Sequence, residues 1–241
     1  MSIAEKLAIV AENVPKVYKA GQDELWDGIV YEERTNYTQQ FKDWQMEYIR
    51  PPQKITPVTV GSANQMLRGN TLLKKVESEY FDFSQLATGT SNQEGFHYTF
   101  YGCSALEEVE DVGIGVSNSI YSFNYTFNGC SQLHTISKLT VADTTKFANA
   151  FNACRQLVNL TINGTIGQSG LDLRWSPLSK TSIESVIGAL SETTNGLSIT
   201  LSKAAINSAF GINLDDENTY PEGSEYYTLR HSRDNWTINY G

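Results

Sequence analysis

Hydrophobic and small residues recur at fixed positions in the central part of the chain, where one phrase is written four times. Each copy has an apolar residue, a small residue two places later, and then Asn or Cys, with Leu three residues after it and a further apolar residue three after that. The copies are QMLRGNTLLKKV (65–76), TFYGCSALEEVE (99–110), TFNGCSQLHTIS (126–137) and AFNACRQLVNLT (150–161), with steps of 33, 27 and 24 residues between them. A phrase repeated at such a period is typical of a stacked solenoid.

Each unit is too short to bury its own apolar residues, so it must pack against the copy before it and the copy after it. The Leu-x-x-(Val/Leu/Ile) half predicts a turn that runs into a short strand, with the apolar side chains pointing inward. The Phe-x-Gly-Cys half predicts a helical turn or short helix on the opposite side. The pattern therefore predicts an α/β fold, a short solenoid with stacked strands on one side and short helices or turns on the other.

The phrase F-x-x-C-x-x-L-x-x-(I/V/L) resembles the BspA-like leucine-rich repeats of bacterial surface proteins and of prophage-borne proteins from gut bacteria. The resemblance covers residues 60–170, and the segment from Trp175 to Gly211 is similar to the C-terminal part of those prophage-borne proteins. The chain departs from the family in lacking a regular Pro and an even spacing, which implies inserted loops. The resemblance implies a non-enzymatic interaction or ligand-recognition module, prophage-encoded and structural or host-recognising; the alternative is a BspA-type surface adhesin.

The pattern divides the chain into three parts. Residues 1–21 step in apolar positions by three and four, which predicts an amphipathic helix with Ser2 as its N-cap. This helix either docks on the solenoid or serves in oligomerisation. Residues 22–60 are rich in aromatics and are expected to form an N-terminal cap over the first coil, with an aromatic ligand platform as the alternative. Residues 61–241 form the solenoid, closed by a strand at Trp236–Tyr240.

Beyond the fourth copy the rhythm continues with new residues. We expect short strands at Leu171–Leu173 and Leu197–Leu201, and a helix that opens with a capping box at Thr181 to Glu184. A second helix is predicted at Lys203–Phe210, because Ser202 is a good N-cap and Gly211 a good stop. The acidic segment 213–227 is expected to be a loop.

Charge and hydropathy disfavour several classes of binding partner. The net charge of −9 and the pI of about 4.9 disfavour nucleic acid and anionic lipid. No apolar run is long enough for a membrane span, so no membrane insertion is expected. The first residues lack the features of a secretory signal, which favours a cytoplasmic or virion-associated protein over a secreted one.

The cysteines occupy one column of the repeat, as Cys103, Cys130 and Cys154. This placement predicts buried thiols in the core rather than a zinc site or a disulfide, because the histidines fall in other columns and the cysteine count is odd.

No motif in the sequence is a strong match to a known catalytic, metal-binding or cofactor-binding motif. The acidic run 215–217 lacks the alternation and glycine of a calcium loop, and Gly113-Ile114-Gly115 is an isolated GxG. Ser169 lies in GQSG rather than in a hydrolase elbow. The histidines at 97, 134 and 231 suggest no Cys–His or Ser–His arrangement, and the N-x-T tripeptides read as strand and turn residues. We therefore expect no enzymatic activity, no catalytic residues, and no cofactor or metal.

The outward-facing strand positions are the remaining candidate for function, because they should align between coils. One row is Lys75, Glu108, Thr135 and Asn159, and the next is Glu77, Glu110, Ser137 and Thr161. These small polar side chains suit contact with protein or carbohydrate. The sequence fixes neither the ligand nor the oligomeric state.

Overall fold

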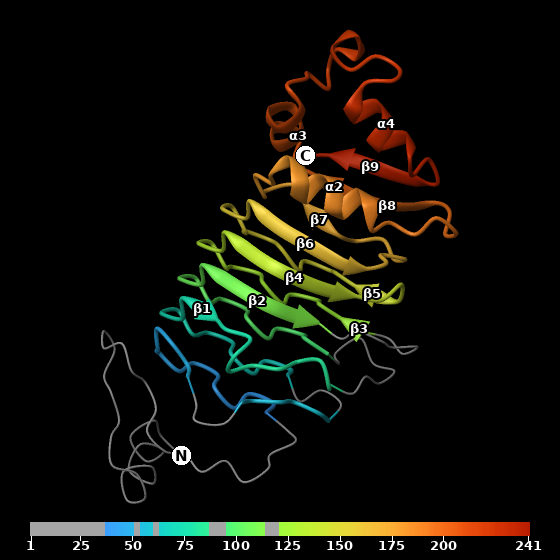
Figure 1. Ribbon diagram of the computed structural model, residues 1–241. Coiled ribbons are helices and arrows are strands. Elements are labelled where there is room, and N and C mark those ends of the chain that lie inside the picture. Colours follow the sequence, from blue (N-terminus) through green and yellow to red (C-terminus); the bar gives the residue numbers. More distant parts are fainter. Residues whose placement is uncertain (1–36, 51–53, 60–62, 87–94, 114–120) are drawn as a thin grey trace, which may run out of the picture.

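The computed structural model describes residues 37–50, 54–59, 63–86, 95–113 and 121–241. The helix expected over residues 1–21 and the first part of the expected cap lie outside these ranges. The described chain is a mixed α/β fold with parallel sheets and a few short helices, arranged as successive layers (Figure 1).

The described residues form three sheets, and each of them is parallel. The largest has the order β1-β2-β4-β6, formed by Lys75–Val76, Glu108–Gly113, Thr135–Val141 and Asn159–Gly164. The second pairs β3 (Tyr121–Ser122) with β5 (Thr145–Lys146). The third has the order β7-β8-β9, formed by Asp172–Leu173, Leu197–Leu201 and Trp236–Tyr240. Parallel pairing places each strand one layer above its predecessor.

The four copies of the phrase occupy consecutive layers, in the register that the sequence pattern predicts. The last apolar residue of each copy pairs with its equivalent in the next: Val76 with Val109, Val109 with Ile136, and Ile136 with Leu160. All four are buried. The inward columns of the repeat are thus continuous through the layers.

The Phe-x-Gly-Cys halves form turns, and the alternative of a short helix is wrong for all four copies. Each turn contains two residues with positive φ, such as Tyr98 (57°) and Gly102 (73°). In the fourth copy Ala153 takes the glycine position at φ 66°. Backbone bonds join the turns of neighbouring layers, as from Phe100 N to the Thr126 carbonyl (3.0 Å). A helix would direct these N–H groups into its own turns, so the ladder between layers replaces it.

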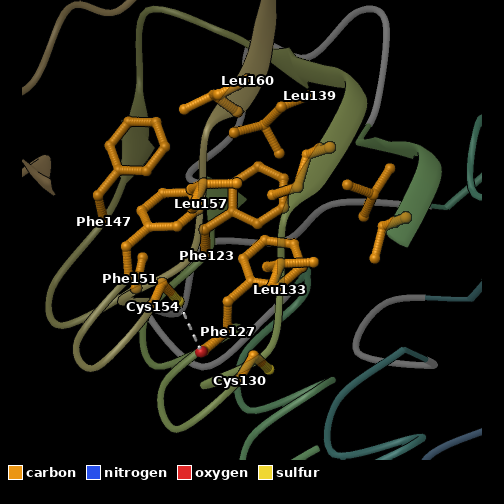
Figure 2. Close-up of a cluster of buried hydrophobic side chains, with 14 of the residues drawn as sticks. Phe123, Phe127, Cys130, Leu133, Leu139, Phe147, Phe151, Cys154, Leu157 and Leu160 are labelled. Carbon is orange, nitrogen blue, oxygen red and sulfur yellow. Dashed lines mark hydrogen bonds between the residues drawn. The ribbon is translucent and has the colours of Figure 1, made fainter. Parts of the chain in front are cut away.

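Phenylalanine rings, thiols and leucine side chains line up in columns in the interior (Figure 2). The rings of Phe100, Phe127 and Phe151 stack with centroids 5.2 and 5.4 Å apart. Their spacing matches the roughly 4.8 Å that separates hydrogen-bonded strands. Cys130 and Cys154 lie beside them and are fully buried. The predicted column of core cysteines is confirmed.

The described residues of the expected N-terminal cap extend the same ladder by one layer. Phe41 N donates to the Met66 carbonyl (2.9 Å), and Lys74 N donates to the carbonyl of Glu47 (2.9 Å). Phe41 is fully buried and meets the ring of Trp44 edge-on at 5.1 Å. Residues 37–50 therefore act as a further copy with a degenerate sequence.

Helix α2 (Lys180–Gly188) covers the far edge of the four-stranded sheet. It begins after Ser179, two residues before the capping box that the sequence predicts. The hydroxyls of Ser182 and Ser185 accept hydrogen bonds from the backbone N–H groups of Leu160 and Ile162 in β6, both at 2.9 Å. The helix thus satisfies an edge that would otherwise be open to pairing.

The C-terminal part follows the prediction except in the segment 213–227. Strands β8 and β9 and helix α3 (Lys203–Phe210) have the predicted bounds, with Ser202 as N-cap and Gly211 left-handed at φ 64°. The segment expected as a loop contains a short 3-10 helix, Glu217–Thr219, and the first residues of α4 (Glu225–His231). Ser224 caps α4, and Glu225 in its first turn and Arg230 near its end suit the helix dipole.

Candidate functional site

The first predicted surface row is assembled as expected on the outer face of the four-stranded sheet. Lys75 pairs with Glu108, Glu108 with Thr135, and Thr135 with Asn159. The charges compensate one another, because Lys75 Nζ lies 3.3 Å from Glu108 and 2.7 Å from Glu110. At the other end Asn159 Nδ2 donates to Thr135 Oγ1 at 3.3 Å. Much of the hydrogen-bonding capacity of this row is spent within the row.

The second predicted row is interrupted, and its last member requires a correction. The register between β4 and β6 shifts between Ile136 and Leu139, so Thr161 does not continue the line from Ser137 one for one. Glu110 is held by Lys75 and by the backbone N–H of Ser78 (2.8 Å), and these bonds lower the pKa of its carboxyl. The bulge adds one residue to β4, which a phrase-by-phrase alignment could not reveal.

A different surface gathers aromatic side chains at the edge made by the turns. We call it the tyrosine edge, and it consists of Arg68, His97, Tyr98, Tyr101 and Tyr125. Tyr98 and Tyr125 stack in neighbouring layers with ring centroids 4.8 Å apart and planes 9° apart. Tyr101 meets Tyr98 edge-on at 5.2 Å. The Arg68 guanidinium lies 5.2 Å from the centre of the Tyr98 ring and 5.1 Å from that of the Tyr101 ring.

The backbone fixes the positions of these side chains. Tyr98 and Tyr125 both occupy the first left-handed position of their turns, with φ 57°. Tyr98 N donates to the Asn124 carbonyl (3.2 Å), and Tyr125 N donates to that of Ala148 (2.9 Å). A non-glycine residue is rare in this conformation, so the flanking layers must hold it there. The rings therefore stand on a preorganised backbone.

The electrostatics of the tyrosine edge are set by Arg68 and His97. Burial and the neighbouring Arg68 lower the pKa of His97, so its imidazole is neutral at pH 7. Arg68 also donates to the side chain of Gln65 at 2.8 Å. The edge thus offers one guanidinium, phenol hydroxyls and half-buried ring surface. Such a surface can bind a partner through its rings and its guanidinium.

Sequence reasoning missed the tyrosine edge, although a signal was present. The tripeptide Tyr-Thr-Phe occurs at residues 98–100 and again at 125–127, in the same place of the phrase. The interpretation of the phrase covers its Phe, Gly, Cys and Leu columns but not the tyrosine that precedes them. Because the columns align between layers, an identical residue in two copies predicts two side chains in contact.

The weak motifs of the sequence have structural roles. Ser169 Oγ accepts a hydrogen bond from Ser198 N (2.9 Å), and Asp216 caps the 3-10 helix. Asp215 forms an ion pair with Lys203. Burial raises the pKa of all three thiols, to about 12 for Cys103, so they are protonated and unreactive at neutral pH.

The described residues contain no group of three or more His, Cys, Asp or Glu side chains arranged to hold a metal ion. None of their helices has the length and apolar character needed to cross a membrane. Compared with known proteins, the chain matches no protein-family model, no curated protein and no solved structure.

Proposed function

We propose that the chain is a non-enzymatic recognition module built on a short leucine-rich-repeat solenoid of the BspA-like kind. Support for the solenoid comes from the four copies of the phrase, which lie in consecutive layers and pair in register along their strands. Further support comes from the second ladder of backbone bonds between the turns. Repeat architectures of this kind present extended surfaces for partners.

The observation that carries the recognition function is the tyrosine edge. Tyr and Arg are the residues that most often dominate binding energy at interfaces, since they combine large contact area with directed hydrogen bonds. Tyr98 and Tyr101 lose little side-chain entropy on binding, because their rings already pack against Arg68 and each other. We expect a protein partner that presents an acceptor to Arg68 and apolar surface to the rings.

The sheet face is the weaker candidate for the same role. Its charged residues, Lys75 with Glu108 and Lys138 with Asp111, are paired within the face. A partner would have to break these pairs or leave them at the rim, where exposed ion pairs contribute little.

The biological setting that we propose is a phage structural or host-recognition role. It rests on the resemblance of the repeat phrase to that of prophage-borne proteins. Immunogold labelling of particles induced from a strain that carries the gene is expected to decorate the virion. Absence of the protein from purified particles would remove this setting but would leave the recognition surface to be tested by itself.

Photo-crosslinking tests the recognition surface. We would place p-benzoylphenylalanine at Tyr101, on the tyrosine edge, and at Lys138, an exposed residue of the sheet face, as the matched control. Intact bacterial cells of the strain carrying the gene are irradiated with each protein. We expect a discrete adduct from position 101 and none from position 138.

A competition experiment tests whether the adduct from position 101 is specific. Unlabelled protein is expected to abolish the adduct, whereas a Tyr98→Ala, Tyr125→Ala double variant should compete poorly because the stacked pair is gone. Equal adducts from positions 101 and 138, or none from position 101, would contradict the proposal.

A further inference from the structure

A groove lies at the C-terminal end of the layers, on elements separate from the tyrosine edge. It has a volume of about 370 Å³ and lies between the turn after β7 and helix α3. Its walls include Arg155, Trp175 and Pro177, and its floor includes Ser202, Ala204 and Ser208. This volume is at the lower end of the range for small-molecule sites, enough for one or two rings.

Trp175 is the most exposed large hydrophobic side chain among the described residues, at 51%. Its neighbours are firmly anchored. Leu173 and Ser176 are buried, and Ser176 Oγ donates to the Cys154 carbonyl at 3.2 Å. Ser176 N also donates to the carbonyl of Leu173 at 3.0 Å. The indole is therefore displayed on a fixed backbone instead of being left outside by a flexible loop.

Arg155 completes the wall. Its guanidinium carbon lies 5.1 Å from the centre of the Trp175 ring, a cation–π arrangement that holds both side chains at the groove. Within the described chain Arg155 has no ion-pair partner, so its N–H groups can serve a ligand. The other cation of the groove, Lys180, is already paired with Glu225 and lies over the ring of Phe210.

Space remains above helix α3 because the helix presents small residues to the groove. Ala204 and Ser208 are exposed along the groove, and Ser202 is the N-cap of the helix. A longer side chain at any of these positions would fill the space beside Trp175. The hydroxyl of Ser208 adds a hydrogen-bond donor and acceptor to the floor, where the Ser202 hydroxyl already accepts from Ala205 N.

We propose that this groove is a carbohydrate subsite that binds a pyranose ring against Trp175. The electron-rich face of an indole attracts the polarised C–H groups that line one face of a pyranose. The hydroxyls of the sugar then find donors and acceptors at Arg155 and Ser208. A proline-rich peptide would need a row of aromatic side chains, and the groove supplies only Trp175. Nucleic acid is disfavoured by the net charge of −9.

The site extends the proposed recognition function to a ligand class, but it stands on different residues. The methyl glycosides of glucose, galactose, mannose and N-acetylglucosamine are the probes, titrated into the full chain in the millimolar range. Saturation-transfer NMR and tryptophan fluorescence report binding. We expect at least one glycoside to bind and to shift the fluorescence.

Variants locate the site. Trp175→Ala is expected to weaken binding at least roughly tenfold, as for truncation of an aromatic anchor. Ser208→Phe, which keeps the indole but fills the floor, is expected to weaken it as well. Leu72→Ala removes another exposed hydrophobic side chain, 39% exposed and in an early layer, and should bind like the parent. Circular dichroism checks that each variant is folded.

The assignment is overturned if no glycoside binds, if binding survives Trp175→Ala, or if a decaproline peptide binds at Trp175 in place of the sugars. Tyr98→Ala should leave glycoside binding unchanged. A loss there would assign the sugar to the tyrosine edge and would refute the groove. Crosslinking from Tyr101 is read independently, so failure of this site and failure of the proposed function are distinguishable.

Discussion

The thiol of Cys130 donates a hydrogen bond to the carbonyl oxygen of Phe100, which lies 3.1 Å away in the preceding layer. The same step recurs in the neighbouring layers, from Cys103 to Leu67 and from Cys154 to Phe127. The repeat thus selects a small buried residue with a hydrogen-bond donor at this position. Asn70 meets the same requirement in the first copy, with its Nδ2 2.6 Å from the Phe41 carbonyl.

Substitutions at Asn70 test this requirement for a donor. Asn70 is fully buried, and its Nδ2 faces the carbonyl oxygens of Phe41 and Leu67. Asn70→Asp would place a carboxylate against these oxygens, so we expect a loss of about 3 kcal/mol or more at pH 7. The introduced carboxyl would have a raised pKa in the folded state. Its stability contribution would be present at low pH and lost as pH rises through that pKa.

Asn70→Cys is the matched control, because Cys fills this position in the other copies. We expect it to change the free energy of unfolding by less than about 1 kcal/mol, since it also removes the unpartnered Asn70 Oδ1. Urea titrations at pH 4 and pH 7 measure both variants. Equal stability of the two variants at pH 7 would contradict the donor requirement.

Phe127→Ala tests the stacked rings of the core. Phe127 is fully buried between Phe100 and Phe151, so its removal should cost about 3–5 kcal/mol. Glu108→Ala is the control, because Lys75 keeps its closer partner Glu110. That change should stay within about 0.5 kcal/mol. Similar losses at the two sites in urea would show that the layers are not registered as described.

Features set by local sequence or by the repeat were predictable. Ser202 and Gly211 bound α3 because a cap and a left-handed stop act over a few residues. The row through Lys75 and Glu108 follows from aligning the phrases. Where a residue's role depends on its neighbours in the chain or on its column, the sequence contains the information.

Features set by contacts between layers were not predictable in the same way. The residues around Tyr98 do not predict its left-handed backbone conformation, because a backbone hydrogen bond to the next layer holds it there. The layer formed by Phe41 and Ile49 went unrecognised because it has one residue fewer between its turn and its strand position. The N-cap of α2 is Ser179 rather than Thr181, because Ser182 bonds β6 from inside the helix. The candidate site was missed for a different reason: the repeated Tyr-Thr-Phe is visible in the sequence, but its tyrosine column was not interpreted.

The left-handed position at the end of each turn gives a reciprocal prediction. Ala153 has φ 66° where other copies have glycine, and a left-handed conformation costs a residue with a Cβ about 1–2 kcal/mol. We therefore expect Ala153→Gly to stabilise the protein by about 1 kcal/mol. Gly129→Ala should destabilise it by a similar amount. An added Cβ there would meet no atom closer than 3.5 Å, so the cost comes from the left-handed φ and not from a clash.

Thermal unfolding of both variants measures these changes. Gly113→Ala is the positive control, because its Cβ would lie 2.1 Å from the Thr140 carbonyl oxygen and would force the strands apart. Destabilisation by Ala153→Gly would show that φ strain is not what distinguishes the fourth copy.

The buried thiols predict a loss of stability at alkaline pH. Burial raises the pKa of Cys103 to about 12, and it raises those of Cys130 and Cys154 as well, while unfolded thiols ionise near pH 8.5. The unfolded chain therefore releases protons that the folded chain retains. The stabilisation is complete below the unfolded pKa and is lost progressively as pH rises toward 12.

At pH 8 the native protein should not react with a disulfide reagent such as dithionitrobenzoate, whereas all three thiols should react in guanidinium. A triple Cys→Ser variant should show a shallower alkaline loss, and part of the loss that remains should come from Tyr80, Tyr220 and Tyr226, whose pKa values are also raised by burial. Rapid labelling of the native protein would mean that the cysteine column is open to solvent.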